Sequence, residues 1–292
     1  MDTMNEIPVV FSTDHGYIKP TVVAIHSLLE CSTDCKIHLF VILDDDVTDD
    51  DKGVLCGVAN KFNASIDLLF PENVFSNVFE TRGITRATYF RLLIPWMFPQ
   101  YPKIIYCDGD IVFCQSISRL YNIDVADNSF AGVHTPFYDC GYFCNYCKEN
   151  NINQGNYING GILLINTDFV KKLITKEKII SKLEHKYLYQ DQDIINILFS
   201  DTIKLIPLKY NFPSYIHPVI DEDPVVVHYS GPKPWKVFTH RWPLWWSKYR
   251  NTAIYNAEEE YNFCNSIIYP DYSLKSLAKL LGRYIKRHII KK

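Results

Sequence analysis

The chain has 292 residues, of which 47% are apolar and 22% are charged, a balance typical of globular rather than disordered proteins. Its net charge of −3 is unevenly distributed, because residues 274–292 carry seven basic side chains and no acidic one. The rest of the chain holds 23 basic and 33 acidic side chains. An acidic body with a basic tail argues against general nucleic-acid binding and for a role specific to the tail.

The first residues, M-D-T-M-N-E-I-P, contain no apolar signal segment. The longest apolar runs are far shorter than the ~20 residues that a membrane span needs. We therefore expect a cytoplasmic protein. Its nine cysteines are an odd number, which fits reduced thiols better than a disulfide framework.

Strand and helix patterns alternate over the first 70 residues. Strands are predicted at 7–11, 37–43 and 66–70, and helices at 19–30 and 48–62, the second beginning at a Thr48 cap. This alternation predicts an α/β fold with a parallel sheet and ligands at the carboxyl ends of its strands.

A loop is predicted at 71–86, followed by an apolar helix at 87–97 that contains Arg91. The pattern leaves two alternatives open for this arginine. Its guanidinium either reaches solvent along the helix surface or enters the site as the partner of an anion.

An acidic pair interrupts an apolar strand at the centre of the chain. Residues 103–107 predict a buried strand, Asp108-Gly109-Asp110 follows directly, and the strand pattern resumes at 111–113. Asp108 and Asp110 would point to the same side, and Gly109 adds no side chain that could obstruct a ligand. Two carboxylates there suit a divalent cation that also carries a diphosphate. A hydrogen-bonded structural pair is the alternative.

The Asp-x-Asp spacing alone means little, because it recurs elsewhere in the chain. The other pairs are Asp44 and Asp46, Asp49 and Asp51, Asp191 and Asp193, and Asp221 and Asp223. The first two of these pairs lie in a polar D-D-D-V-T-D-D-D stretch that is typical of a solvated loop and helix start, whereas Asp108 and Asp110 interrupt an apolar strand pattern that resumes after them.

A strand is predicted at 131–134, and a segment rich in asparagine and aromatic residues follows it. Cys140, Cys144 and Cys147 have the spacing C-x3-C-x2-C, which also binds iron–sulfur clusters. A zinc ion with His134 as fourth ligand is a second alternative. The loop-like composition favours a third, in which the thiols bind nothing.

Three later segments carry polar groups at the ends of predicted elements. Asn159 and Gly160 precede a strand at 162–165, where glycine would let the backbone approach a ligand. Asp191, Gln192 and Asp193 begin a helix, a position at which carboxylates often only cap. A strand at 225–228 ends in His228, and a turn with Gly231 and Lys233 follows, which suggests a metal ligand beside a phosphate-binding cation.

The C-terminal segment has an apolar helical stripe of Leu274, Leu277, Ala278, Leu281, Ile285 and Ile289. One interpretation is a helix docked on the core. The other is a basic amphipathic helix on an anionic membrane surface, for which Trp242, Trp245 and Trp246 just upstream are further support.

Six motifs in this order resemble the retaining glycosyltransferases of family 8. They are V-V-F-S-T-D-x-x-Y, Y-F-R-L-L-I-P, I-I-Y-C-D-G-D-I-V, N-G-G-I-L-L-I-N, Y-Q-D-Q-D-I-I-N and H-Y-S-G-x-K-P-W. The resemblance implies a GT-A fold, with a Rossmann-like sheet over 1–235 as the catalytic domain and an aromatic, basic helical region over 236–292.

The resemblance also implies roles for the matching residues. Asp108, Asp110 and His228 would hold Mn²⁺, with Mg²⁺ as the alternative. Ser12, Asp14 and Tyr17 would bind the nucleoside, and Gly231 and Lys233 the diphosphate. The donor sugar would be surrounded by Arg91, Asn159, Gly160, Asp191 and Gln192, with Gly109 also in the donor site. Gln192 would lie nearest the reacting carbon, which favours a front-face substitution, and Asp191 is the second candidate for a nucleophile.

The implied activity is transfer of glucose or galactose from a UDP-hexose to a lipopolysaccharide core or a similar glycan or glycolipid. Such an enzyme would work at the inner face of the cytoplasmic membrane. Two alternatives remain at this point: a self-glucosylating protein similar to glycogenin, which 20 tyrosines would allow, and a catalytically silent protein that binds metal and nucleotide.

Overall fold

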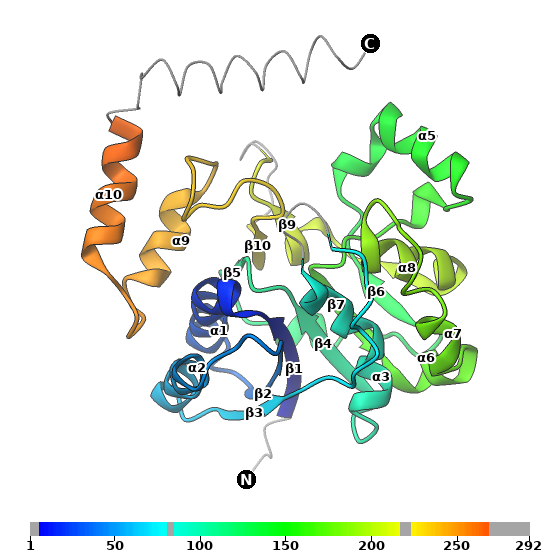
Figure 1. Cartoon of the computed structure of the whole chain (residues 1–292), viewed down its shortest axis with the longest axis horizontal. Helices are drawn as coiled ribbons and strands as arrows, with labels where there is room; N and C mark the ends of the chain where they lie inside the picture. Colours follow the sequence, from blue (N-terminus) through cyan, green and yellow to red (C-terminus); the bar gives the residue numbers. More distant parts are fainter. Residues whose placement is uncertain (1–5, 81–84, 217–222, 269–292) are drawn as a thin grey trace.

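Two β-sheets carry the site in the computed structural model, which describes residues 6–80, 85–216 and 223–268 (Figure 1). The larger sheet has the order β3-β2-β1-β4-β7-β6-β8. Its strands are β1 (Glu6–Thr13), β2 (Lys36–Leu43), β3 (Ser65–Leu69), β4 (Lys103–Cys107), β6 (Phe130–Gly132), β7 (Ile162–Asn166) and β8 (Ile203–Leu205). The smaller sheet has the order β5-β10-β9, from β5 (Ile111–Phe113), β9 (Phe212–Pro213) and β10 (Val226–His228).

The larger sheet is mostly parallel, as predicted. β1 pairs in parallel with β2 and β4, and β2 pairs in parallel with β3. β7 is the exception, because it runs antiparallel to both β4 and β6. An apolar run such as Ile162–Ile165 predicts burial on both faces but carries no information about strand direction.

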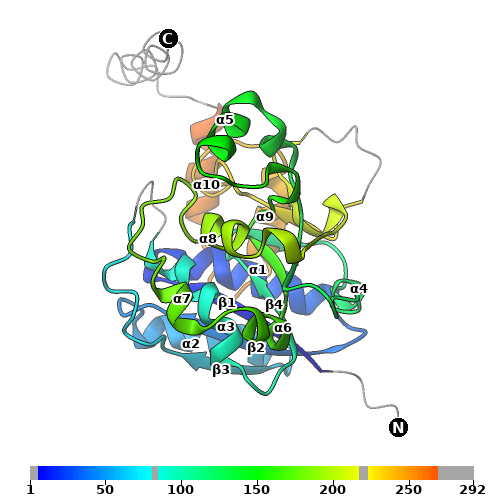
Figure 2. The ribbon, with the colours of Figure 1, turned by 90° about the vertical axis from the view of Figure 1, so that its right-hand side faces the viewer.

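Helices cover both faces of this sheet. On one face α1 (Ile18–Cys31) and α2 (Asp49–Lys61) pack on Val9 and Phe11 of β1. On the other face, Val10 contacts a core built from a 3-10 segment (Arg86–Leu93), α3 (Ile94–Met97), α6 (Thr167–Leu173), α7 (Lys176–Ile180) and α8 (Gln190–Leu198). Figure 2 shows α6, α7 and α8 on the side of the sheet that faces the viewer. The alternation of β1 side chains between two cores is what a central strand requires.

The helix expected at 87–97 is largely wrong in type, because Arg86–Leu93 is a 3-10 helix and only Ile94–Met97 is α-helical. The Arg91 Nε donates a hydrogen bond of 2.8 Å to the Thr88 carbonyl. That carbonyl would otherwise be an acceptor for the α-helical pattern, and Pro95, which has no N–H, adds a second interruption.

β5 does not extend β4, as the resumed strand pattern had suggested. After Asp108-Gly109-Asp110 the chain joins the smaller sheet, where β5 pairs antiparallel with β10 and His228 lies opposite Ile111. The acidic segment therefore bridges two sheets. This places it beside the end of a strand from a distant part of the chain.

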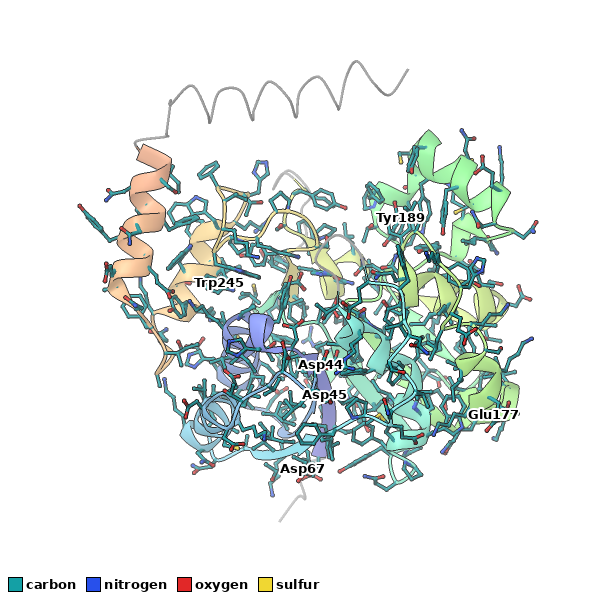
Figure 3. The ribbon with its side chains drawn as sticks, in the orientation of Figure 1. Asp44, Asp45, Asp67, Glu177, Tyr189 and Trp245 are labelled. Atoms are coloured by element: carbon teal, nitrogen blue, oxygen red, sulfur yellow. The ribbon has the colours of Figure 1, made fainter. Side chains whose placement is uncertain are left out.

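α9 (Trp242–Tyr249) and α10 (Ala257–Ile268) form an apolar cluster with Val23 of α1, Val112 of β5 and Val227 of β10. Trp245, labelled in Figure 3, and Trp246 are 0% and 2% exposed. The interpretation that these two tryptophans face a membrane is therefore wrong, because they fill this cluster. Residues 274–292 lie outside the described part of the chain, and among the described helices none has the length and apolarity needed to cross a bilayer.

The segment after β6 is more ordered than its loop-like composition predicted. It contains a 3-10 turn (Pro136–Asp139) and α5 (Gly141–Glu149), whose Phe143 and Cys147 pack with Tyr138 and Tyr157 in a small separate core. The other short elements are α4 (Ser118–Tyr121) and 3-10 turns at His15–Tyr17, Gln154–Asn156, Ser200–Thr202 and Leu208–Asn211.

Candidate functional site

A cavity of about 530 Å³ opens where β1 and β4 end. Its lining includes nearly every site residue predicted from the sequence: Ser12, Asp14, Tyr17, Arg91, Asp108, Gly109, Asp110, Asn159, Asp191, Gln192, His228, Gly231 and Lys233. Gly160 lies behind this lining, where its carbonyl accepts a hydrogen bond from Arg91. The smaller sheet, α8 and the turn after β10 thus meet β1 and β4 around one space.

Asp108, Asp110 and His228 form a compact cluster at this cavity. One ligand atom from each residue lies within 4.8 Å of the others, and His228 Nε2 is 3.2 Å from Asp110 Oδ1. Across residues 6–80, 85–216 and 223–268, no other set of three or more His, Cys, Asp or Glu side chains is close enough to share a metal ion. The three insert cysteines and His134 consequently do not form the iron–sulfur or zinc site considered above.

Asp110 is buried between the Lys233 ammonium and the His228 ring. Its carboxylate pairs with the Lys233 ammonium and faces the His228 ring. Burial acts to raise the pKa of Asp110, but Lys233 and His228 outweigh burial and hold that pKa well below its ordinary value. Asp110 is therefore ionised at neutral pH and available as an oxygen ligand.

Arg91 enters the site, which decides between the two alternatives. Its side chain is 4% exposed, and its guanidinium lies 2.9 Å from Asp108 Oδ1 and 2.8 Å from Asp191 Oδ2. The hydrogen on Nε points to the Thr88 carbonyl, so Asp191 Oδ2 is in ionic contact without a directed hydrogen bond. Arg91 thus compensates two carboxylates at once.

Asp191 holds its proton more tightly than an ordinary aspartate. Burial raises its pKa to about 6, against the lowering effect of Arg91, and Asp108 raises it further. A buried carboxyl whose pKa is raised by burial and by a nearby carboxylate is typical of functional sites.

Tyr106 was missed by the sequence analysis. Its hydroxyl donates to Asp108 Oδ1 at 2.9 Å and lies 2.8 Å from Ser12 Oγ, while Arg91 stacks over its ring at 4.5 Å. The signal was present, because strand alternation places Tyr106 on the same side as Asp108.

Asp14 and Tyr17 form one wall of the cavity. Asp14 Oδ1 accepts the Tyr17 backbone N–H at 2.9 Å, and Asp14 Oδ2 accepts the Thr85 hydroxyl at 2.6 Å. Burial raises the pKa of the Tyr17 phenol, and Asp110, Asp108 and Asp14 raise it further. Tyr17 therefore presents a neutral ring and a hydroxyl donor.

The Gln192 side-chain amide is held by four hydrogen bonds. Its Oε1 accepts from the Gly160 backbone N–H at 2.9 Å and from Asn159 Nδ2 at 3.2 Å. Its Nε2 donates to the hydroxyls of Tyr138 and Tyr157, both at 3.0 Å. Both lone pairs of Oε1 are occupied, so this oxygen is not a free nucleophile.

Three glycines at the site make room for protein side chains. A Cβ on Gly109 would overlap Thr21, one on Gly160 would lie 2.8 Å from an Arg91 nitrogen, and one on Gly161 would lie 2.6 Å from His228 Nδ1. The expectation that Gly109 and Gly160 simply clear space for a ligand is thus incomplete. They also allow Thr21 and Arg91 to lie against the backbone.

Several aromatic side chains complete the cavity and had no motif to reveal them: Phe137, Tyr138, Tyr189 and Tyr215. Figure 3 labels Tyr189, which lies between α5 and α8, across the molecule from Trp245 on α9. Asn211, buried behind His228, was missed for the same reason.

The residues present fit a divalent cation. Two carboxylates and one imidazole form a hard-to-borderline set that suits Mn²⁺ or Mg²⁺, and the Lys233 ammonium beside them suits a phosphate group. A tetrahedral thiolate site of the zinc type is absent from the part of the chain that the structure describes.

The chain is similar to known proteins in sequence and in fold. The family model for Glycosyl transferase family 8 matches residues 8–239. The lipopolysaccharide glucosyltransferase WaaO of Escherichia coli K12 is 26% identical, over 98% of this chain and 86% of that protein. A putative glycosyltransferase of Haemophilus influenzae is 31% identical, over 79% of this chain and 72% of that protein. The galactosyltransferase LgtC, solved with donor and acceptor sugar analogues, superposes with a TM-score of 0.74 at 22% identity, covering 87% of this chain and 99% of LgtC.

Proposed function

Because the chain belongs to glycosyltransferase family 8 and has its GT-A fold, we propose that it transfers glucose or galactose from a UDP-sugar to a glycan, with retention of configuration. The glycan proposed is a lipopolysaccharide core or a related glycolipid, by analogy with the relatives named WaaO and LgtC.

The observation that carries this proposal is the cluster of Asp108, Asp110 and His228 beside Lys233. When the bond between the anomeric carbon and the phosphate oxygen of a UDP-sugar breaks, UDP leaves, so catalysis requires positive charge where the phosphate oxygens lie. A dinegative carboxylate pair repels phosphate unless a cation lies between them. This cluster is therefore best suited to a metal-bound nucleotide.

Asp108, Asp110 and His228 would hold the Mn²⁺ or Mg²⁺. When bound, the ion supplies a Lewis acid that stabilises negative charge on the departing UDP. Lys233 would add a second positive charge from the turn after β10. Charge that is held in place before the reaction usually lowers the barrier of such a transfer more than any other effect.

Ser12, Asp14 and Tyr17 would bind the nucleoside at the end of β1. Asp14 is fixed by the Tyr17 backbone and Thr85, so its carboxylate is already oriented before the donor arrives. Tyr17 packs edge-on against Trp235, with ring centroids 6.1 Å apart. Because these side chains are already ordered, donor binding loses less side-chain conformational entropy.

Gln192 and Asp191 would lie at the sugar. Because Gln192 Oε1 already accepts two hydrogen bonds and Nε2 donates two, we propose that Gln192 does not attack the sugar but stabilises charge at the reacting carbon by its dipole. Asp191 is tied to Arg91, which also argues against attack by its carboxylate. A front-face substitution follows, in which a donor phosphate oxygen accepts the proton of the incoming hydroxyl.

The basic segment 274–292 would hold the enzyme at an anionic membrane surface, where lipid-linked acceptors are found. Each engaged basic side chain contributes on the order of 1 kcal/mol near such a surface. This part of the proposal depends on the sequence alone.

Metal-dependent hydrolysis of UDP-sugars tests the proposal. We expect the purified protein to release UDP from UDP-glucose or UDP-galactose with Mn²⁺ and to stop when a chelator is added, while N-acetylated analogues identify the sugar preference. The variant Asp110→Asn, which keeps the side-chain volume, is the matched control and should be inactive. Hydrolysis that survives in Asp110→Asn or in the chelator would contradict the proposal.

A further inference from the structure

An unbroken series of side-chain hydrogen bonds runs from His228 to Asp193 through Asn159 and Gln192 in the cavity wall; we call it the relay. It begins at His228 Nδ1, which lies 2.8 Å from Asn211 Oδ1, and Asn211 Nδ2 donates to Asn159 Oδ1 at 2.9 Å. Asn159 Nδ2 donates to Gln192 Oε1 at 3.2 Å, and Gln192 Nε2 donates to the Tyr157 hydroxyl at 3.0 Å. The Tyr157 hydroxyl donates to Asp193 Oδ1 at 2.5 Å. It connects the candidate metal ligand to the amide at the proposed sugar site.

The direction of the relay is determined at its Asp193 end. Three donors converge on this buried carboxylate: the hydroxyls of Tyr157 and Tyr146, both at 2.5 Å, and the Tyr189 backbone N–H at 2.8 Å. Since Asp193 accepts from all three, the Tyr157 hydroxyl donates its one hydrogen to Asp193. The oxygen of Tyr157 is left to accept from Gln192.

Two backbone N–H groups determine the same direction independently. Gly160 N–H donates to Gln192 Oε1, and Gly161 N–H donates to Asn159 Oδ1, both at 2.9 Å. A backbone N–H can only donate, so each contact identifies the oxygen end of the amide. Neither amide can turn over without placing two donors face to face.

The direction of these hydrogen bonds determines which ring nitrogen of His228 carries the hydrogen. Because Asn211 gives its Nδ2 hydrogen to Asn159, its Oδ1 must face His228 Nδ1, and an amide oxygen can only accept. Nδ1 therefore carries a hydrogen. In the neutral ring the lone pair is then on Nε2, the nitrogen that lies 3.2 Å from Asp110 Oδ1.

We propose that Asn211 is a positioning residue that holds His228 in the Nδ1–H tautomer, so that Nε2 offers its lone pair to a cation beside Asp108 and Asp110, and that Tyr157 and Asp193 are positioning residues that keep the relay amides in place behind it. The same contacts hold Gln192, and the metal site and the sugar site are therefore oriented by one structure. Partners of this kind behind a metal-binding histidine typically change metal affinity 10- to 100-fold when they are removed. The inference rests on the proposed function only for the identity of the cation site.

A merely structural role for these buried residues predicts a different result, namely loss of stability with no change in the tautomer. The variant Asn211→Leu separates the two, because it keeps a similar volume and removes both relay contacts. Asn166→Leu is the matched control: Asn166 also uses its amide fully, with Val125 and Phe169, but it lies at the far end of β7.

The direct measurement is the long-range ¹H–¹⁵N spectrum of the histidine rings in the metal-free protein at alkaline pH. The His228 signal is identified by its loss in His228→Asn. We expect the Nδ1–H tautomer in the wild type and in Asn166→Leu, and a mixture in Asn211→Leu. Calorimetric titration with Mn²⁺ should show affinity at least 10-fold weaker in Asn211→Leu and unchanged in Asn166→Leu.

A second pair of variants tests the Asp193 end of the relay and leaves every amide side chain in place. Tyr157→Phe and Tyr146→Phe each delete one hydroxyl bonded to Asp193, but only Tyr157 passes the contact on to Gln192. We expect Tyr157→Phe to weaken Mn²⁺ binding several-fold more than Tyr146→Phe. Equal effects of the two variants, or an unchanged His228 tautomer in Asn211→Leu, would overturn the proposal.

The tautomer and the Mn²⁺ affinity are measured without any sugar nucleotide. If both respond as expected and no UDP-sugar is hydrolysed, the relay is confirmed and the proposed function is wrong. If hydrolysis is metal-dependent and the tautomer does not respond, the relay is wrong and the function stands.

Discussion

Gly161→Ala is the substitution that most directly tests how the site is packed. The backbone at Gly161 does not adopt a positive φ, so an alanine is conformationally allowed there. Its Cβ would nevertheless overlap the His228 ring, lying 2.6 Å from Nδ1 and 3.0 Å from Asn159 Oδ1. The effect of this variant is therefore steric.

The magnitude follows from those distances. To restore ordinary contact the His228 ring must move by roughly 1 Å, and a misplacement of that size in a reacting group costs about 100-fold in rate. Overpacking of this kind costs about 1–3 kcal/mol in the free energy of unfolding. We expect Gly161→Ala to fold, to bind Mn²⁺ more weakly and to lose most UDP-sugar hydrolysis.

Gly57→Ala is the matched control, because Gly57 is exposed on α2 and a Cβ there meets nothing within 4 Å. It should raise the free energy of unfolding by about 0.5–1 kcal/mol and leave hydrolysis unchanged. Denaturant unfolding, Mn²⁺ titration and UDP release are measured on both variants. Wild-type Mn²⁺ affinity and activity in Gly161→Ala would refute the reasoning, because the His228 ring would then accommodate the added Cβ without being displaced.

Four further predictions concern individual groups. Asp110→Asn should abolish UDP release without unfolding the protein, because it removes a charged oxygen ligand at a strand end; a circular dichroism spectrum that changes along with activity would contradict this. Gln192→Ala should lower kcat far more than it weakens UDP binding, and equal losses would mean that Gln192 only shapes the cavity. The raised pKa of Asp191, about 6, means that the folded state binds this proton more tightly than the unfolded chain. Wild-type stability should therefore fall as pH rises from about 4 to about 7, by up to about 3 kcal/mol for this group. In urea titrations the stability of Asp191→Asn relative to wild type should rise over the same interval, and a flat difference would exclude the assignment. Deleting residues 274–292 should preserve UDP release and reduce co-sedimentation with anionic vesicles in a salt-sensitive way, whereas salt-insensitive or absent vesicle binding by the full chain would count against a membrane role.

Local patterns predicted most of the fold, because buried strands and capped helices have recognisable sequence patterns over a few consecutive residues. Thr48, for example, caps α2 as its sequence suggested. The direction of β7 and the membership of β5 in a second sheet depend on contacts between distant segments. The local periodicity of apolar residues carries no information about either. The 3-10 form of Arg86–Leu93 depends on Arg91, whose side chain binds a backbone carbonyl of its own turn.

The candidate site divides in a similar way. Asp108, Asp110 and His228 were identified because charged groups at strand ends stand out against apolar runs. Asn211 and Tyr157 were not, because an asparagine in a loop and a tyrosine among 20 others acquire meaning only from their partners. The use of Gly160 and Gly161 as space for Arg91 and His228 likewise becomes visible only when the segments are brought together.

The antiparallel pairing of β5 with β10 has a thermodynamic consequence. Asp110 immediately precedes β5, His228 ends β10, and His228 lies opposite Ile111 in the ladder. A cation held by both strands would bind the closed sheet, in which β5 and β10 are paired, and not the open one, in which they are apart. By mass action, an ion present at 100 times its Kd adds about 2.7 kcal/mol to the closed state. Local opening of this small sheet would then require release of the ion, so the two short strands should separate less often when the ion is bound.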